Sequence, residues 1–96
     1  MTKVVENITE FDLSSYLDSD EAIAEYLTEV LNDGDTNEFL RAISHIAKAK
    51  GMSDIARKTG LSRTSLYKVF SDDSKPRFET VMKLLKAFGI RLEAVV

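Results

Sequence analysis

The run IARKTGLSRTSLYKV, residues 55–69, decides the fold that we expect for this chain. Its apolar residues have the spacing of two short helices that pack across a three-residue turn, as in a helix-turn-helix. Gly60 permits the left-handed conformation that such a turn requires, and Ala56 is small where the two helices would cross. The sequence therefore predicts helices at about residues 53–59 and from 62 or 63 to 70. Their shared core would consist of Ile55, Leu61, Leu66 and Val69.

Two more helices are predicted before this motif, because apolar residues repeat there at helical spacing. The first is expected at about residues 20–32, after Asp18 or Ser19 as its cap. The second is expected to begin at Asp35 or Thr36 and to end at Gly51. Ser53 is then a natural N-cap for the first helix of the motif. The apolar stripe of the second helix is Phe39, Leu40, Ile43, Ile46 and Ala47.

A fifth helix and a short strand are predicted after the motif. Pro76 suits the first turn of a fifth helix, which ends at Gly89. Its buried stripe would be Phe78, Val81, Leu84, Leu85 and Phe88. Residues 90–96 begin with alternating apolar and charged side chains, which is the pattern of a strand with one buried face, and such a strand needs a partner. The expected fold class is all-α, with five helices and a short C-terminal β-strand.

The chain is long enough for one ordinary domain, residues 1–96, and not for two. Cysteine is absent, so neither a disulfide framework nor a thiolate metal site is expected, and a single histidine, His45, cannot build a zinc site. No apolar run has the length of a membrane span or of a secretory signal, so we expect a cytoplasmic protein. We divide the domain into an N-terminal extension (1–17), an acidic helical part (18–50), a helix-turn-helix (51–71) and a C-terminal helix and strand (72–96).

Charge is distributed unevenly along the chain. Residues 1–40 contain one lysine and eleven acidic residues, a net charge of −10, whereas residues 41–96 contain twelve basic and five acidic residues, a net charge of +7. The basic part is able to attract nucleic acid although the whole chain is acidic. The acidic part suits a basic protein partner, or else it is a solubilising surface.

The predicted outward face of the second motif helix has the residue types that read DNA. The second helix of such a motif enters the major groove, where Arg63 would contact a guanine and Thr64 would offer a hydroxyl or a methyl group. Serines at helix starts and flanking cations would bind phosphates. The candidate DNA-contacting residues are Ser53, Ser62, Arg63, Thr64, Ser65, Tyr67, Lys68, Lys75 and Arg77.

Several of these features also have a purely structural interpretation. The motif could be a helical hairpin whose cations form a solvated face, and Tyr67 could pack against the loop at 71–75. His45 is expected to be a partly exposed helical residue. Asp72 and Asp73 fit turn chemistry better than a metal site. No nucleophile is matched with a base, so we expect a binding protein without cofactor or metal rather than an enzyme.

The chain contains, in this order, Phe11-Asp12 with Tyr16-Leu17, Ala22-Ile23 with Tyr26-Leu27, the runs GMSDIA (51–56) and GLSRTSLYK (60–68), and Pro76-Arg77-Phe78 with Val81. Through these residues it resembles the HigA-like addiction-module antidote proteins, antitoxins with a helix-turn-helix of the lambda-repressor (Xre) type. The resemblance extends over nearly the whole chain. The first motif helix is shorter than in lambda-type repressors, so the side chain at its start has no clear counterpart here. Arg63 and Thr64 are therefore stronger candidates for DNA contacts than Ser53.

The resemblance implies an antitoxin that neutralises a RelE/ParE-like toxin, usually a basic ribonuclease, and that represses its own operon as a homodimer bound to operator DNA. A stand-alone Xre-type regulator without a toxin, and an interaction module that has lost its DNA role, are the alternatives. The dimer contact is expected at helix 77–88 with strand 90–96. The same strand could instead extend a sheet edge of the toxin.

Overall fold

The computed structural model describes residues 15–96. It contains five helices in this range: α2 (Asp20–Asp33), α3 (Thr36–Lys50), α4 (Met52–Thr59), α5 (Arg63–Phe70) and α6 (Phe78–Phe88). The all-helical prediction is confirmed for these residues. Phe11 and Asp12, which carry part of the family resemblance, lie outside the described residues, as does most of the predicted N-terminal extension. Between residues 15 and 96, no helix is long and apolar enough to cross a membrane.

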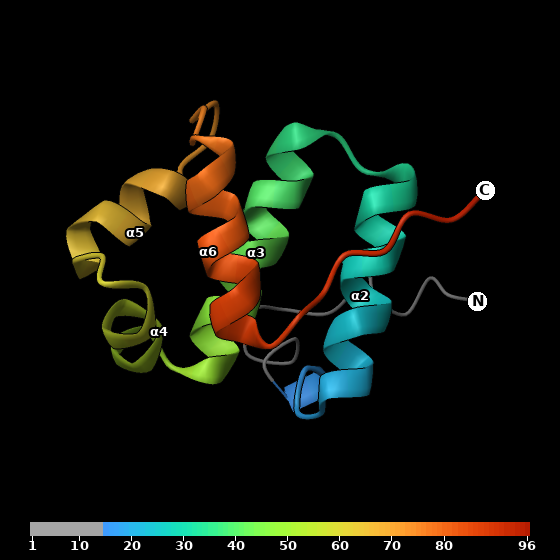
Figure 1. The fold of residues 1–96 in the computed structure, drawn as a ribbon, viewed down its shortest axis with the longest axis horizontal. Helices are drawn as coiled ribbons and strands as arrows, with labels where there is room; N and C mark the ends of the chain where they lie inside the picture. The colour runs from blue at the N-terminus through green and yellow to red at the C-terminus, as the bar shows by residue number, and fades with distance from the viewer. Residues whose placement is uncertain (1–14) are drawn as a thin grey trace.

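Helix α3 is the centre of the fold, because it contacts each of the other four helices. Figure 1 shows α3 behind α6, with α2 on one side of this pair and α4 and α5 on the other. The acidic helix α2 and the second motif helix α5 therefore lie on opposite sides of the molecule. This separation leaves two distant surfaces with different charge.

Side-chain caps set the start of three helices at the residues that the sequence indicated. The amide of Ala22 donates to Ser19 Oγ at 3.1 Å before α2. At α3, the amide of Glu38 donates to Asp35 Oδ1 at 2.8 Å and the amide of Asp35 donates to Glu38 Oε1 at 2.8 Å, which completes a capping box. Ser62 caps α5 in the same way. Each cap satisfies amide groups that a helix start leaves unpaired.

The core lies where α2, α4, α5 and α6 meet α3. Ala42 and Ala47 are fully buried on α3, where small side chains let the other helices approach. Burial raises the pKa of Tyr26 on α2, and the positive charge of Arg41 on α3 partly opposes this shift. The largest fully buried side chains come from all five helices: Leu27, Leu40, Ile43, Ile46, Ile55, Leu66, Leu84 and Leu85.

The start of the last helix differs from the prediction. Helix α6 begins at Phe78 with Arg77 as its N-cap residue, so Pro76 lies in the preceding loop and not in the first turn. Phe78 was expected in the buried stripe, but 75 % of it is exposed. It is the first residue of α6, two turns before the buried Leu85, and at that end of the helix the core no longer covers it. Phe78 and Met82, which are one turn apart, form an exposed apolar pair that we call the α6 face.

The prediction of a C-terminal strand is wrong. Residues 90–96 form no strand, and the amide of Ile90, which donates to the carbonyl of Leu85 at 2.9 Å, makes the last backbone hydrogen bond of the described chain. Figure 1 shows this segment leaving α6 and crossing over α2. A strand needs a second extended backbone beside it, and helices supply none to residues 90–96. The alternation of apolar and charged side chains in the sequence shows which of them would share a face of a strand. It does not show whether a partner strand is present.

Candidate nucleic-acid interface

Helices α4 and α5 pack together across a three-residue turn, residues 60–62. Gly60 ends α4 in the left-handed conformation, with φ of 76° and ψ of 8°. The buried hydroxyl of Thr59 donates to the carbonyl of Ile55 at 2.8 Å and accepts from the amide of Leu61 at 3.2 Å, so it closes the end of the helix. Ile55 and Leu66 are fully buried between the helices. The turn thus holds α5 in a fixed position with its other side in solvent.

The exposed side of α5 consists of Arg63, Thr64, Tyr67 and Lys68. One helical turn separates Arg63 from Tyr67 and Thr64 from Lys68, so the four side chains form one patch. Tyr67 is 47 % exposed, so its side chain is accessible to a ligand. Within residues 15–96, Arg63 and Lys68 form no ion pair. We call these four residues the α5 face.

Ser62 and Ser65 have a structural role at the start of this face. The amide of Ser65 donates to Ser62 Oγ at 3.0 Å, and the Ser62 hydroxyl lies 3.0 Å from Ser65 Oγ, to which it donates. Both hydroxyls are therefore used to fix the first turn of α5. Ser62 is exposed and Ser65 is partly buried, so Ser62 is the more accessible of the two.

Ser53 does not cap α4, contrary to the prediction. The N-cap residue is Gly51, and α4 makes no side-chain capping hydrogen bond. The amide of Gly51 donates to Ala47 at the end of α3, whereas its carbonyl accepts from Ile55 at 3.0 Å at the start of α4. One glycine, with φ of 102°, thus ends one helix and starts the next. Ser53 is consequently the second residue of α4, where its side chain is exposed.

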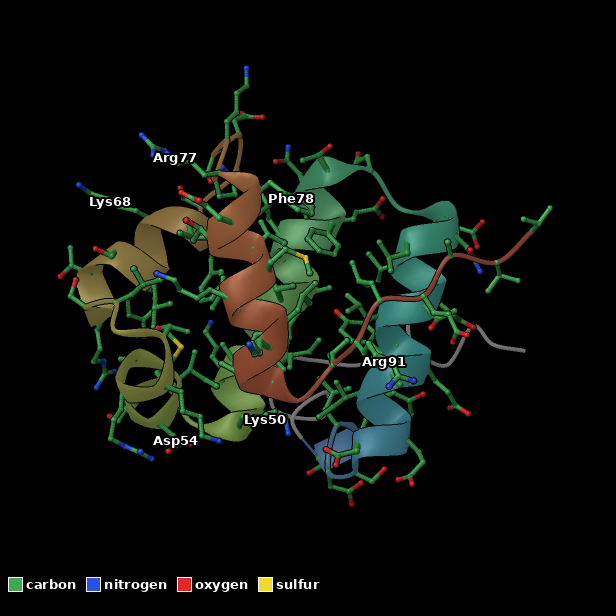
Figure 2. The ribbon with its side chains drawn as sticks, in the orientation of Figure 1. Lys50, Asp54, Lys68, Arg77, Phe78 and Arg91 are labelled. Carbon is green, nitrogen blue, oxygen red and sulfur yellow. The ribbon has the colours of Figure 1, made fainter. Side chains whose placement is uncertain are left out.

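Lys75 and Arg77 come from the loop between α5 and α6, and both are exposed. Figure 2 shows Arg77 and Lys68 pointing outward to the same side of the molecule, although they come from different elements. Arg77 lies 3.9 Å from Glu79, and both of these side chains are at least 80 % exposed, so this contact restrains the arginine little. Lys75 forms no ion pair with any described residue.

Two polar contacts with α3 hold this loop in place, and the sequence did not reveal them. Asn37 and Asp73 form two hydrogen bonds, and Arg41 Nη1 lies 3.2 Å from Asp72 Oδ1. Asp73 has φ of 62°, which is an uncommon conformation for a residue other than glycine. Both aspartates therefore have a structural role, because their contacts hold the loop against α3. Between residues 15 and 96, no group of three or more acidic or histidine side chains is arranged to hold a metal ion.

Two cations on α4, Arg57 and Lys58, were not among the predicted site residues, and Lys58 lines a groove with Asp54 and the start of α2 rather than with α5. Both form ion pairs with Asp54, which precedes them by three and four residues. Lys58 Nζ lies 3.3 Å from Asp54 Oδ2. This spacing is the one at which side chains meet on a helix, so the sequence contained the signal. Both cations remain about half exposed or more, at 72 % and 47 % of their side chains. His45, as expected, is a partly exposed residue of α3.

Comparison with known proteins gives matches over nearly the whole chain. Residues 7–96 match a family model described as "Probable addiction module antidote protein". An uncharacterized protein of Haemophilus influenzae (strain ATCC 51907 / DSM 11121 / KW20 / Rd) is 40 % identical over 90 residues, which cover 94 % of this chain and 93 % of the relative. No solved structure matches the chain.

Proposed function

The chain belongs to the family of probable addiction module antidote proteins, and on this premise we propose that it is an antitoxin that also binds operator DNA. In this proposal it neutralises a toxin of the RelE/ParE-like class and represses its own operon through a lambda-repressor-like helix-turn-helix formed by α4 and α5. The α5 face carries the DNA half of the proposal, because Arg63 and Lys68 are exposed there and unpaired within residues 15–96.

Helix α5 would enter the major groove with its N-terminal end toward the bases. Arg63 would donate to O6 and N7 of a guanine, and Thr64 would contact a neighbouring base through its hydroxyl or methyl group. Tyr67 would lie near the edge of the groove. Ser62 and Ser65 would orient these side chains by fixing the first turn, and Ser62 would also reach a phosphate.

Cations around the α5 face would bind the phosphate backbone. Lys68, Lys75 and Arg77 extend the positive surface past the end of α5. Ser53 would offer a hydroxyl in the first turn of α4. Because these contacts release counterions from DNA, binding would weaken steeply with salt.

A second copy of the chain would bind at the α6 face. Phe78 and Met82 are exposed at 75 % and 37 %, and burial against the same residues of a partner would remove this apolar surface from water. A two-fold dimer would present two α5 helices to two operator half-sites. We propose that this homodimer acts in the cytoplasm, where it would meet both DNA and the toxin, and that it acts by binding rather than by catalysis.

Co-expression with the protein encoded by the adjacent reading frame tests the antitoxin half. We expect that the adjacent protein arrests growth when expressed alone, and that this chain restores growth and co-purifies with it. A chain that binds its own promoter but neither rescues growth nor co-purifies would be a regulator without a toxin. A chain that rescues growth without binding promoter DNA would refute the DNA half alone.

A further inference from the structure

A groove of about 670 Å³ lies between α2 and the segment 90–96, on the side of the molecule away from the α5 face. Leu31 of α2 and Leu92 and Val95 of the segment line it, with 51 %, 44 % and 85 % of their surface exposed. Leu27 closes it toward the core. Three exposed apolar side chains around one groove differ from isolated surface hydrophobics, because together they favour burial against another molecule.

The backbone of the segment also lacks partners. From residue 91 to residue 96 no amide donates and no carbonyl accepts a hydrogen bond within the described part of the chain. Figure 2 shows Arg91 lying over α2, and the segment lines the groove together with this helix. An extended segment with free amides and carbonyls is able to pair with another extended chain.

The acidic residues beside the groove favour a basic partner. Helix α2 contains five acidic residues and no lysine or arginine, and the segment opposite it adds one acid, Glu93, and one cation, Arg91. Glu21, Glu25 and Glu29 are exposed and one turn apart, and helical periodicity places this row next to the row of Ala24, Thr28 and Asn32 that lines the groove. Among the acids of α2, only Asp20 has an ion-pair partner in residues 15–96, Lys50 at 3.3 Å.

This row of glutamates is unfavourable for the isolated chain, because like charges four residues apart destabilise a helix. Two copies that met at this groove would bring their acidic rows close together, so a second copy is a poor occupant. A segment with lysine or arginine beside apolar side chains would neutralise the row and fill the groove at once. The α6 face, in contrast, has no such concentration of acids.

We infer that the groove between α2 and residues 90–96 is the docking surface for an extended, basic and partly apolar segment of the toxin. This inference rests on the proposed antitoxin function and adds where the toxin binds. The apolar side chains of its segment contact Leu31, Leu92 and Val95, its cations face Glu25 and Glu29, and its backbone pairs with that of residues 91–95.

The probe is the protein encoded by the adjacent reading frame, and its affinity for full-length variants of this chain is the measurement. We expect Leu31→Ser combined with Leu92→Ser, and separately Glu29→Lys, each to weaken binding about tenfold or more. The matched control is Glu79→Lys, which makes the same change of charge on α6. This control should retain the affinity of the unchanged chain for the probe. Circular dichroism and promoter binding verify the fold, and Glu29→Lys, at an exposed position, tests the surface even if the leucine variant unfolds.

The outcomes separate the inference from the proposed function. If the unchanged chain binds the probe and both groove variants bind equally well, the docking surface is wrong and the antitoxin function stands. If the groove variants turn a dimer into monomers without loss of probe binding, the groove is the contact between copies, which also overturns the inference. If the unchanged chain does not bind the probe, the antitoxin function fails, and the inference fails with it.

Discussion

Asn37 of α3 holds Asp73 of the α5–α6 loop through two hydrogen bonds across 36 positions of sequence. Its Oδ1 accepts from the Asp73 amide at 2.8 Å, and its Nδ2 donates to Asp73 Oδ1 at 3.1 Å. The pair stabilises the positive φ of Asp73, and the neighbouring contact between Arg41 and Asp72 ties the loop to α3 a second time. The central helix thereby determines where Lys75 and Arg77 lie relative to α5.

Replacement of Asn37 should loosen this loop. We expect Asn37→Ala to lower the free energy of unfolding by about 1 kcal/mol, because two solvent-exposed hydrogen bonds are lost. It should also weaken DNA binding, since Lys75 and Arg77 would no longer be held beside α5. Urea denaturation and a DNA titration measure the two effects. Asn32→Ala on α2 is the matched control, and a loss of the same size there would show that the tether has no special role.

The turn between α4 and α5 depends on the backbone of Gly60. An added Cβ would meet no atom within 4 Å, so Gly60→Ala tests conformation without steric overlap. We expect a loss of about 1 to 2 kcal/mol in the free energy of unfolding, because an alanine resists a φ of 76°. Gly89 has φ of 82° and equally open surroundings, so Gly89→Ala should cost a similar amount. Thermal or urea denaturation that finds no loss in either variant would contradict this explanation.

Phosphate contacts by the cations around α5 should appear in the salt dependence of DNA binding. We expect Lys68→Ala, Lys75→Ala and Arg77→Ala each to reduce the slope of log affinity against log salt by about one. Affinity measured at several salt concentrations gives this slope. Arg91→Ala is the control, because Arg91 lies over α2 on the other side of the molecule (Figure 2). Equal slopes in all four variants would argue against the proposed DNA surface.

Dimerisation through the α6 face depends on Phe78. We expect Phe78→Glu to convert a dimer into a monomer, because two carboxylates would be brought into an apolar contact. Sedimentation or light scattering at several concentrations measures the mass. Leu31→Glu on α2 should leave the dimer intact. The assignment of this interface is wrong if Phe78→Glu remains dimeric, or if only Leu31→Glu dissociates.

Local signals in the sequence were sufficient for most helix boundaries. Ser19, Asp35 and Ser62 are caps that act within three residues, so their side-chain chemistry is readable without knowledge of the fold. Ser53 failed as a cap because Gly51 supplies the end of α3 and the start of α4 together. A polar residue two positions later is indistinguishable from a cap in sequence alone.

Contacts between distant residues could not be predicted in the same way. Apolar periodicity shows which side of a helix is buried, whereas a pair such as Asn37 and Asp73 has no periodic signature. The segment 90–96 has the alternation of a strand, but alternation does not report the absence of a partner backbone. The division of charge along the chain could be predicted from the sequence. The structure adds that the acidic helix α2 and the α5 face lie on opposite sides of the molecule.

The central claim is that α5 reads DNA through Arg63, and fluorescence anisotropy on two duplexes tests it most directly. One duplex carries the region upstream of the chain's own reading frame, and the other carries the same bases in scrambled order. We predict that Arg63→Ala loses about 1 to 3 kcal/mol of binding free energy on the first duplex and little on the second, whereas Arg91→Ala changes neither. A folded Arg63→Ala variant that binds both duplexes as the unchanged chain does would contradict the claim.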